Sequence, residues 1–437
     1  MLWGYAMIAI DESRCCYCGG CVSVCPADAL YLAETRLHVQ EGCLDCGECI
    51  AACPTGALRL TPALMVQQQP CRRSYDLVVV GGGPAGATAA RFAAERGLSV
   101  LLVDRRQEIG SPVQCAEGVG HAMLAPFVAP DARWISATIR RARIVALGDN
   151  PADMTLRTED AIGYVLERRV FDRALAERAV IAGAEVMVKT RATGLLWEGG
   201  MVRGVQLVTP AGQCEVEAKI VIGADGVGSL VGRWGGLDTR LPARDLMTCA
   251  QYLLAGIDID PECTCYYIGE QIAPGGYAWV FPKGEGRANV GLGVQADLAE
   301  ATPLEYLNRF IADQPTLAQG HPVSLIVGGV PVALTPDQIV NDGLMLVGDA
   351  ARQVDPLTGG GITSGMSAGR IAAEVASEAI AAGNTSAAFL RPYETRWAEA
   401  LGRKMVRNYR LRERFPPGKR GDSRFLQVFA MAVGGAK

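Results

Sequence analysis

A spaced set of cysteines near the start of the chain, written twice, constrains the fold more than any other feature. The segments CCYCGGCVSVCP (15–26) and CLDCGECIAACP (43–54) both contain C-x2-C-x2-C-x3-C-P. Three thiolates at i, i+3 and i+6 can surround one iron–sulfur cubane in a tight loop, and the fourth cysteine then ligates the other cubane. The spacing therefore predicts two [4Fe–4S] clusters within the first 60 residues.

The predicted ligands form two groups of four, each completed by a cysteine of the other motif. The first group is Cys15, Cys18, Cys21 and Cys53, and the second is Cys43, Cys46, Cys49 and Cys25. Cys16 is left over, and we expect it not to be a ligand. Zinc is the alternative, but zinc sites typically use C-x2-C pairs separated by longer loops. Residues 6–60, with the repeat CPADAL and CPTGAL, resemble the bacterial two-cluster ferredoxins.

Composition narrows the class of protein. The chain has 437 residues, 15 cysteines and a net charge of −4. Its length predicts more than one domain, and its charge gives no reason to expect a nucleic-acid partner. The start lacks the basic region and cleavage site of a signal peptide, and no apolar run reaches the roughly 18 residues of a membrane span. Metal binding in a reducing compartment, the cytoplasm, therefore explains the cysteines better than disulfides do.

A second motif follows a linker at 61–74. The segment YDLVVVGGGPAGATAARFAAERGLSVLLVD (75–104) has the strand, glycine turn, helix, strand and acid of a dinucleotide-binding unit. The start of its helix offers free N–H groups to phosphate. Its terminal acid, eighteen residues after the last motif glycine, is placed to bind a ribose. The predicted cofactor contacts here are Gly81, Gly83, Pro84, Ala85, Gly86, Asp104 and Arg105.

Two later segments favour FAD over NAD. AKIVIGADGVGSLVGR (218–233) and the glycine-rich region 342–374 each read as a strand followed by a polar turn, and the second turn leads into a helix. The positive end of that helix can stabilise a reduced, anionic flavin. Three separated contact segments suit the long FAD molecule. The further predicted contacts are Asp225, Gly226, Gly348, Asp349, Gly360, Gly361 and Ile362.

The three segments resemble a flavoprotein superfamily that includes aromatic hydroxylases, electron-transfer flavoprotein–quinone oxidoreductases and geranylgeranyl reductases. LERRVFDRALAERAVIAGAEV (166–186) fits the same pattern and places Arg168 near the cofactor. The alternative for Arg168 is a solvated arginine at the start of a helix.

Two more motifs resemble the geranylgeranyl reductases, over about residues 75–400. YAWVFP (277–282) should place Tyr277, Trp279 and Phe281 on one strand face, because side chains alternate along a strand. CAEG (115–118) follows the ribose strand. The predicted catalytic residues are Cys115, Glu117, Tyr277 and Trp279. A thiol with a pKa near 8.5 keeps its proton at neutral pH, so Cys115 is the candidate proton donor with Glu117 behind it.

The resemblance implies a fold and a division of the chain. We expect an α+β 2[4Fe–4S] ferredoxin domain fused to an α/β, Rossmann-like FAD-binding domain of the aromatic hydroxylase type, with a mixed-sheet substrate domain and C-terminal helices. The expected parts are a ferredoxin-like domain (1–60), the linker (61–74), a discontinuous FAD-binding domain (75–240 and 335–378) with part of the substrate layer inserted near 135–165, a substrate-binding domain (241–334) and a C-terminal helical region (379–437).

The resemblance also implies the reaction and its partners. Geranylgeranyl reductases use FAD to saturate isoprenoid double bonds of archaeal-type lipids, prenyl diphosphates or prenyl side chains. No second nucleotide-binding motif is visible, so we expect reduced ferredoxin or another low-potential donor to supply the electrons through the clusters. The alternative is a quinone oxidoreductase that passes electrons from ferredoxin-type carriers to a membrane quinone. An oxygen-using hydroxylase is disfavoured because exposed cubanes are oxygen-labile.

The C-terminal region offers two interpretations. Residues 403–420 hold eight lysines and arginines against one acid, and the apolar segment RFLQVFAMAVGGAK (424–437) ends the chain. This pattern is typical of a helix lying on the anionic inner face of the cell membrane. A solvated helix followed by a docked tail would give the same pattern.

Overall fold

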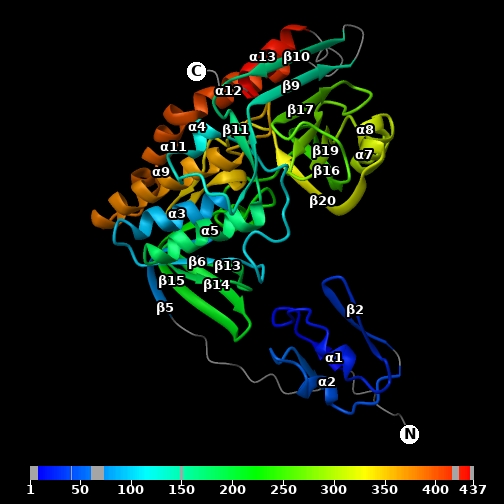
Figure 1. Ribbon diagram of the computed structural model, residues 1–437. Coiled ribbons are helices and arrows are strands. Elements are labelled where there is room, and N and C mark those ends of the chain that lie inside the picture. Colours follow the sequence, from blue (N-terminus) through cyan, green and yellow to red (C-terminus); the bar gives the residue numbers. More distant parts are fainter. Residues whose placement is uncertain (1–7, 41, 61–72, 148–150, 416–422, 434–437) are drawn as a thin grey trace.

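The computed structural model describes residues 8–40, 42–60, 73–147, 151–415 and 423–433 (Figure 1). Its N-terminal unit is small and two-fold repetitive. It consists of β1 (Ile8–Ile10) paired with β4 (Leu58–Leu60), β2 (Leu30–Ala33) paired with β3 (Arg36–Val39), and the short helices α1 (Gly20–Ser23) and α2 (Glu48–Ala51). Gly19 and Gly47, with φ of 74° and 79°, precede the two helices and permit left-handed turns there. The α+β expectation for this unit is confirmed.

The second unit is built on an eight-stranded sheet. Its order is β12 (Glu185–Met187), β6 (Val100–Val103), β5 (Arg73–Val80), β15 (Gly212–Gly223), β14 (Met201–Thr209) and β13 (Arg191–Glu198), with β22 (Leu344–Leu346) also on β15 and β21 (Val340–Asn341) on β22. The strands β12, β6, β5, β15 and β22 pair in parallel. β5 begins two residues inside the predicted linker, because Arg73 and Ser74 pair with Val216 and Glu217.

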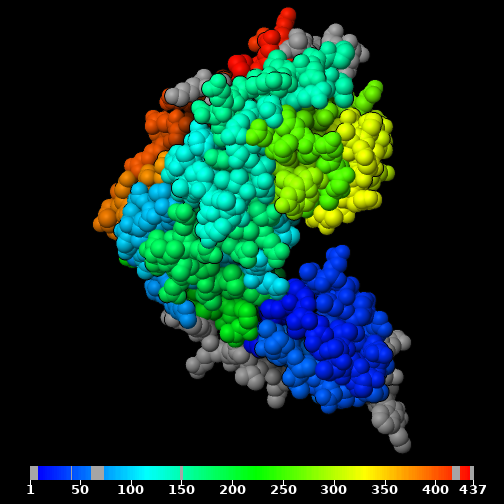
Figure 2. Space-filling model, viewed as in Figure 1, coloured from blue at the N-terminus to red at the C-terminus, as the bar shows by residue number. Residues whose placement is uncertain are grey.

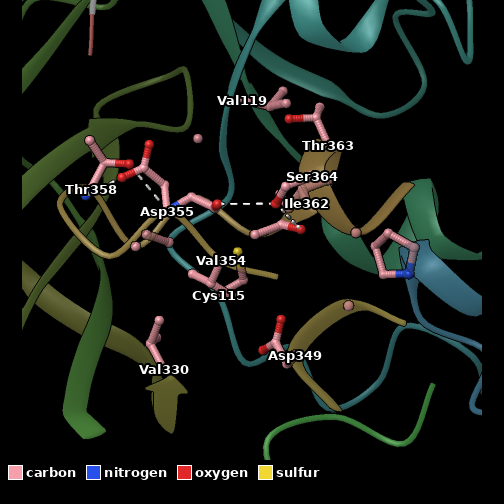
Figure 3. Close-up of a pocket in the computed structure, with 18 of the residues that line it drawn as sticks. Cys115, Val119, Val330, Asp349, Val354, Asp355, Thr358, Ile362, Thr363 and Ser364 are labelled. Atoms are coloured by element: carbon pink, nitrogen blue, oxygen red, sulfur yellow. Dashed lines mark hydrogen bonds between the residues drawn. The ribbon is translucent and has the colours of Figure 1, made fainter. Parts of the chain in front are cut away.

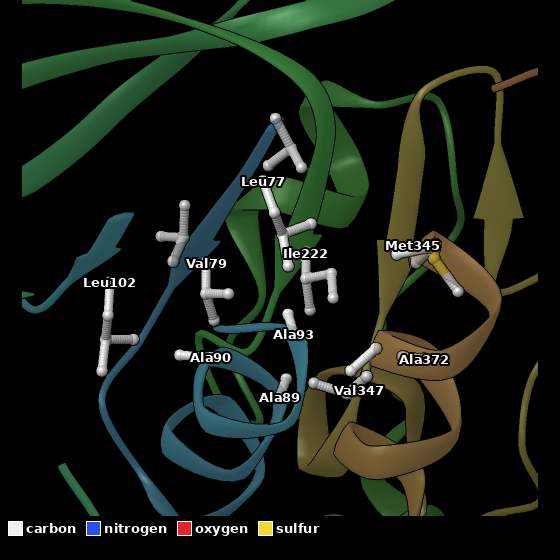
Figure 4. Close-up of a cluster of buried hydrophobic side chains, with 14 of the residues drawn as sticks. Leu77, Val79, Ala89, Ala90, Ala93, Leu102, Ile222, Met345, Val347 and Ala372 are labelled. Atoms are coloured by element: carbon white, nitrogen blue, oxygen red, sulfur yellow. The ribbon is translucent and has the colours of Figure 1, made fainter. Parts of the chain in front are cut away.

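Helices pack closely on this sheet. The principal ones are α3 (Pro84–Ala94), α5 (Arg168–Ile181) and α9 (Ile362–Ala381). Figure 4 shows alanines of α3, among them Ala93, beside Val79 and Ile222 of the sheet. Small residues are needed where α3 meets α9, because a Cβ on Gly369 would lie 2.3 Å from the carbonyl oxygen of Ala85. Parallel strands covered by helices are apolar on both faces, which explains the run LVVV in β5.

A seven-stranded sheet forms the third unit. Its order is β10 (Ala152–Arg157), β9 (Arg141–Ala146), β17 (Cys263–Ile268), β18 (Tyr277–Pro282), β19 (Arg287–Gln295), β16 (Leu246–Ala255) and β20 (His321–Pro331). α7 (Pro303–Ala312) and α8 (Pro315–Ala318) contribute Leu307, Phe310 and Leu317 to the apolar cluster on one face. The chain enters this sheet early, since β9 and β10 come from 141–157. β8 (Ile135–Ile139), near the start of the predicted insertion, instead joins a three-stranded sheet with β7 (Gly118–Gly120) and β11 (Gly163–Leu166).

The C-terminal region is helical and docked. It contains α10 (Ala387–Leu390), α11 (Pro392–Trp397), a π-helical turn (Ala398–Gly402), α12 (Arg403–Arg414) and α13 (Ser423–Val433). Shorter helices elsewhere are α4 (His121–Leu124), α6 (Leu230–Trp234), η1 (Ala243–Asp245) and η2 (Gly348–Ala351). α13 buries Phe425, Leu426 and Phe429 against β9 and its neighbours, so the described part of the predicted apolar tail is a packed helix (Figure 1). Within the described ranges, no helix combines the length and apolar character needed to cross a bilayer.

Candidate active site

The cluster-motif cysteines are brought together in the two groups that the spacing predicts. Burial raises the pKa of the Cys21 thiol, and the nearby charges of Cys15, Cys18 and Cys53 raise it further. Burial likewise raises the pKa of Cys49, which has Cys43, Cys46 and Cys25 as its charged neighbours. Two backbone amides, those of Ala29 and Ala57, donate to the sulfurs of Cys25 and Cys53 at 3.3 and 3.2 Å. These neighbours fit the two predicted ligand groups, and the assignment of each fourth ligand to the other motif stays a prediction.

One contact joins the ferredoxin unit to the large sheet. The side chain of Tyr17, between Cys15 and Cys18, lies against Lys189, whose Nζ donates to the tyrosine oxygen at 3.4 Å and lies 4.6 Å from the ring centroid. The backbone N–H of Lys189 donates to the carbonyl oxygen of Arg106. Figure 2 shows the two units touching on this side of the molecule. The loop of the first cluster motif therefore meets the segment that follows the predicted ribose-binding acid.

A cavity of about 1400 Å³ runs between the two large sheets. Every cofactor contact predicted from the sequence lines it, apart from Gly86. Gly86 instead allows close packing of α3, because a Cβ there would lie 1.9 Å from the carbonyl oxygen of Gly81. Gly81 has φ of 114°, which strains any other residue, and Gly83 has open space in front of it. A cradle of bare backbone facing a cavity suits the pyrophosphate of FAD.

Two acids that the sequence assigns to the cofactor lie in different environments. Asp104 accepts from the N–H groups of Gly82 and Arg106, both at 2.8 Å, so its carboxylate also holds the glycine turn in place. Asp225 accepts from Leu230 and Val231 through Oδ2, while its buried Oδ1 has no partner among the described residues. An orphaned acceptor lining the cavity fits a hydroxyl donor of FAD. Ribose binding by Asp104 stays a prediction.

The glycine-rich turn before α9 closes the other end of the predicted flavin site. Residues from Gly359 to Gly365 line the cavity, so the first turn of this 20-residue helix opens onto it. Burial raises the pKa of Asp349, and the charge of Arg168 partly opposes that shift. Figure 3 shows Asp349, Cys115, Ile362 and Thr363 among the residues that line this part of the cavity. The positive end of α9 opens onto the cavity, where it could stabilise the negative charge of a bound, reduced flavin.

The aromatic residues of β18 form one wall of the cavity. Tyr277, Trp279 and Phe281 all line it, with ring centroids 5.9 and 6.3 Å apart along the strand. The Tyr277 hydroxyl donates to the carbonyl oxygen of Thr358 at 2.5 Å. The Trp279 indole donates to Gln251 at 2.8 Å. Their polar atoms are therefore paired with protein groups, which leaves an apolar face toward the cavity.

Glu117 holds the cysteine-bearing loop in place. Its Oε2 accepts from Lys283 at 2.7 Å and from Asn289 at 2.6 Å, and its Oε1 accepts from the N–H of Arg168 at 2.7 Å. It has φ of 73° and is buried. A carboxylate engaged by three donors is poorly suited to transferring a proton. We therefore assign Glu117 a positioning role in place of the catalytic role expected from the sequence.

Cys115 presents its thiol to the cavity. Its Sγ accepts from the N–H of Glu117 at 3.2 Å, and its carbonyl oxygen accepts from Gln251 at 3.2 Å. Burial raises the pKa of this thiol above its ordinary value of 9.0, although the charge of Arg168 acts in the opposite direction. Arg168 is itself held by two hydrogen bonds to Asp172, at 2.7 and 2.8 Å. Cys115 thus keeps its proton at neutral pH and has a cation nearby to stabilise a thiolate.

The buried Lys283–Glu117 pair leads to a stability prediction. Both side chains are about 5% exposed, and Lys283 also donates to the carbonyl oxygen of Leu166. Lys283→Met should lower the free energy of unfolding by about 3–5 kcal/mol, because it leaves the buried carboxylate of Glu117 without its lysine counter-charge. The exposed pair Arg143–Asp153 provides the matched control, for which Arg143→Met should cost less than about 1 kcal/mol. Thermal unfolding followed by circular dichroism measures both, and equal shifts in melting temperature would contradict the assignment.

Several residues of the site were not found from the sequence. Gln251 and Cys249 lie on β16, more than 130 residues after Cys115, and no local pattern marks them. Cys249 lines the cavity, and its burial raises the pKa of its thiol to about 12. Lys283 follows YAWVFP directly and Asn289 lies in the next strand, β19, so their nearness to that motif was the one available signal.

Three family descriptions match the chain. The 4Fe-4S dicluster domain matches residues 7–57, the FAD dependent oxidoreductase family matches 76–260, and the geranylgeranyl reductase catalytic domain matches 245–330. The third match contains the aromatic wall and most of the seven-stranded sheet. The chain therefore carries a domain for two [4Fe–4S] clusters and an FAD-dependent oxidoreductase domain.

Curated relatives and solved structures agree with these matches. The chain is 50% identical over 350 residues to a digeranylgeranylglycerophospholipid reductase of Methanosphaerula palustris, covering 79% of this chain and 87% of that one. It is 52% identical over 333 residues to the protein of that name in Methanosarcina acetivorans, covering 75% and 81%. A geranylgeranyl bacteriochlorophyll reductase-like structure from Thermoplasma acidophilum has a TM-score of 0.76 at 42% identity, covering 78% and 88%. A flavin-dependent brominase, at 19% identity and a TM-score of 0.65, shares the fold alone.

Proposed function

The chain belongs to the geranylgeranyl reductase family of FAD-dependent oxidoreductases, and from this premise we propose that it saturates the isoprenoid double bonds of a digeranylgeranylglycerophospholipid. The observation that carries the proposal is the cavity that joins the glycine cradle to the wall of Tyr277, Trp279 and Phe281. A prenyl chain needs such an apolar surface beside the flavin site. The identity to relatives of that name supports the phospholipid over a prenyl diphosphate or a prenyl quinone.

The reaction adds a hydride to one alkene carbon and a proton to the other. FAD, when bound, supplies the hydride, and the clusters, when bound, supply single electrons. An isolated alkene is a poor hydride acceptor, so the proton must be available at the same time as the hydride. The thiol of Cys115 holds that proton at Sγ, because burial raises its pKa. The resulting thiolate is stabilised by the charge of Arg168 and by the N–H of Glu117.

The ferredoxin unit is proposed to serve its own chain. The Tyr17–Lys189 contact supports this, because Lys189 lies next to Thr190, which lines the cofactor cavity. The N–H of Thr190 donates to the carbonyl oxygen of Asp104, which also lines the cavity. A single contact of this kind is worth about 0.5–1 kcal/mol at an exposed site. The covalent link between the two units adds a high effective concentration of one for the other. We propose reduced ferredoxin or a similar low-potential carrier as the external donor.

The cell membrane is the proposed source of the substrate. The basic helix α12 supports contact with the anionic inner face of the membrane from the cytoplasmic side, since lysine and arginine are attracted to such a surface. Phe425, Leu426 and Phe429 of α13 face inward, so we propose that the contact is mainly electrostatic rather than by insertion of that helix.

The competing function is a quinone oxidoreductase, and one experiment separates the two. The holoenzyme is reduced without oxygen by a stoichiometric amount of dithionite and mixed with lipid in neutral detergent. Digeranylgeranylglycerophospholipid should restore the absorbance of oxidised flavin, whereas the fully saturated lipid should not. Restoration by menaquinone, with no response to the unsaturated lipid, would support the quinone oxidoreductase instead.

A further inference from the structure

Part of the cavity has an aromatic wall formed by β17, β18 and α13, and we call this part the aromatic branch. Its walls include Tyr266, Tyr277, Phe425 and Phe429. The ring of Phe429, on α13, lies 5.3 Å from Tyr277 and 5.6 Å from Tyr266, centroid to centroid. Phe425 continues the series at 6.0 Å from Phe429. An apolar path therefore runs from the wall on β18 to the C-terminal helices.

The same cavity is basic where it reaches α12. Lys404 and Arg407 line it, and they lie three residues apart, on one face of the helix. We call these two side chains the basic rim. Three contacts connect the rim to the aromatic branch: Tyr277 to the Thr358 carbonyl oxygen at 2.5 Å, the Thr358 N–H to Asp355 Oδ1 at 3.4 Å, and Asp355 Oδ2 to Lys404 Nζ at 3.9 Å. Figure 3 shows Asp355 beside Thr358 at this end of the cavity.

The rim has donors that the protein leaves available. Lys404 lies at the long limit of an ion pair with Asp355, whose carboxylate already accepts from Asn408 at 2.8 Å and from the Leu357 N–H at 3.0 Å. Arg407 is exposed and donates through Nε to Asn408 at 3.3 Å, while its Nη atoms have no hydrogen-bond partner in the described part of the chain.

A third basic residue of α12 differs from the rim. Arg412 also lines the cavity, but it is buried and donates to the carbonyl oxygens of Val332 and Arg244 and to Gln295 Oε1, at 2.9, 3.1 and 2.8 Å. Its hydrogen bonds tie α12 to the rest of the fold. Within the described residues, Lys404 has only the long ion pair with Asp355 and Arg407 a single hydrogen bond to Asn408, whereas Arg412 makes three hydrogen bonds.

We propose that Lys404 and Arg407 bind the phosphate group of the substrate at the end of the aromatic branch, and so give the enzyme preference for phosphate-bearing over neutral prenyl lipids. The inference rests on the proposed function, because it takes the lipid to lie along this branch with its prenyl chain toward Cys115. A guanidinium with free Nη donors can bind two phosphate oxygens, and an ammonium adds a point charge.

The test compares two lipids with identical chains, digeranylgeranylglycerophospholipid and neutral digeranylgeranylglycerol, in neutral detergent micelles so that no anionic surface is present. The double variant Lys404→Ala/Arg407→Ala should raise KM for the phospholipid by about tenfold or more, since charge-assisted hydrogen bonds are lost. It should leave KM for the neutral lipid and kcat for both lipids unchanged. Arg410→Ala is the matched control, because Arg410 is an exposed arginine of the same helix that does not line the cavity.

Binding of the saturated phospholipid, followed by tryptophan fluorescence, separates this inference from the proposed function. The wild-type protein should bind the saturated phospholipid tightly, and the rim variant should bind it about tenfold more weakly. That result would support the inference even if no alkene were reduced. Equal changes in KM for both lipids, no change for either, or the same loss in Arg410→Ala would overturn it. Competition by inorganic phosphate as strong as that by the lipid would also overturn it, because the site would then bind free anions.

Discussion

Replacing Cys115 by serine should slow alkene reduction by on the order of 100-fold or more, which is the usual contribution of a general acid. Serine keeps nearly the same size but is a far weaker acid than a thiol. Turnover of the geranylgeranyl lipid under reducing, oxygen-free conditions measures the loss. FAD content and the rate at which the flavin is reduced through the clusters should stay at wild-type values, since neither depends on the thiol.

The second thiol of the cavity supplies the comparison for this variant. Cys249→Ser removes a buried thiol that lines the same cavity and is close enough to Cys115 for the charge of Cys115 to help raise its pKa. We expect a much smaller loss from it. A large loss in Cys249→Ser with little change in Cys115→Ser would show that the proton donor is assigned to the wrong residue. The pH dependence gives a further check, because the alkaline limb due to Cys115 should lie above its ordinary pKa of 9.0.

Replacing Cys49 by alanine should remove the second cluster and with it about half of the bound iron, since four thiolates hold each cubane. Turnover driven by reduced ferredoxin should fall to background. Alkene reduction by enzyme whose flavin has been reduced chemically should continue, because the cavity lies in the other part of the chain. Iron analysis, low-temperature electron paramagnetic resonance and the two turnover assays together measure the result.

Cys16→Ala is the matched control for the cluster variant. Cys16 lies between the first two predicted ligands, and its thiol contacts the carbonyl oxygen of Arg14 at 3.5 Å. Iron content and turnover should stay normal in this variant. Full iron content in Cys49→Ala, or loss of a cluster in Cys16→Ala, would contradict the grouping of the cysteines.

The sequence correctly predicted those parts of the fold in which the spacing of residues along the chain determines the local geometry. Cysteines at i, i+3 and i+6 can meet only in a tight loop, and Gly81 and Gly86 mark a turn where a Cβ would collide with the backbone. Alternation along β18 placed Tyr277, Trp279 and Phe281 on one face, and the structure confirms that they share it.

What sequence reasoning missed depends on partners distant in the chain. Glu117 looked like part of the proton-donating site with Cys115, but Lys283 and Asn289 engage it from positions more than 160 residues later. From the sequence, the apolar residues of α13 were compatible with two interpretations, because an apolar helix face can pack either on a membrane or on a neighbouring sheet. Only the packing of Phe425 and Phe429 against the sheet shows which surface α13 covers.

The mass of the lipid product tests the central claim most directly. The holoenzyme is incubated without oxygen with reduced ferredoxin and digeranylgeranylglycerophospholipid, and the extracted lipid is analysed by mass spectrometry over time. We predict a stepwise gain of two hydrogens per double bond, with the head group unchanged. A lipid of unchanged mass, in a reaction where added menaquinone is converted to its quinol with an intact side chain, would contradict the account.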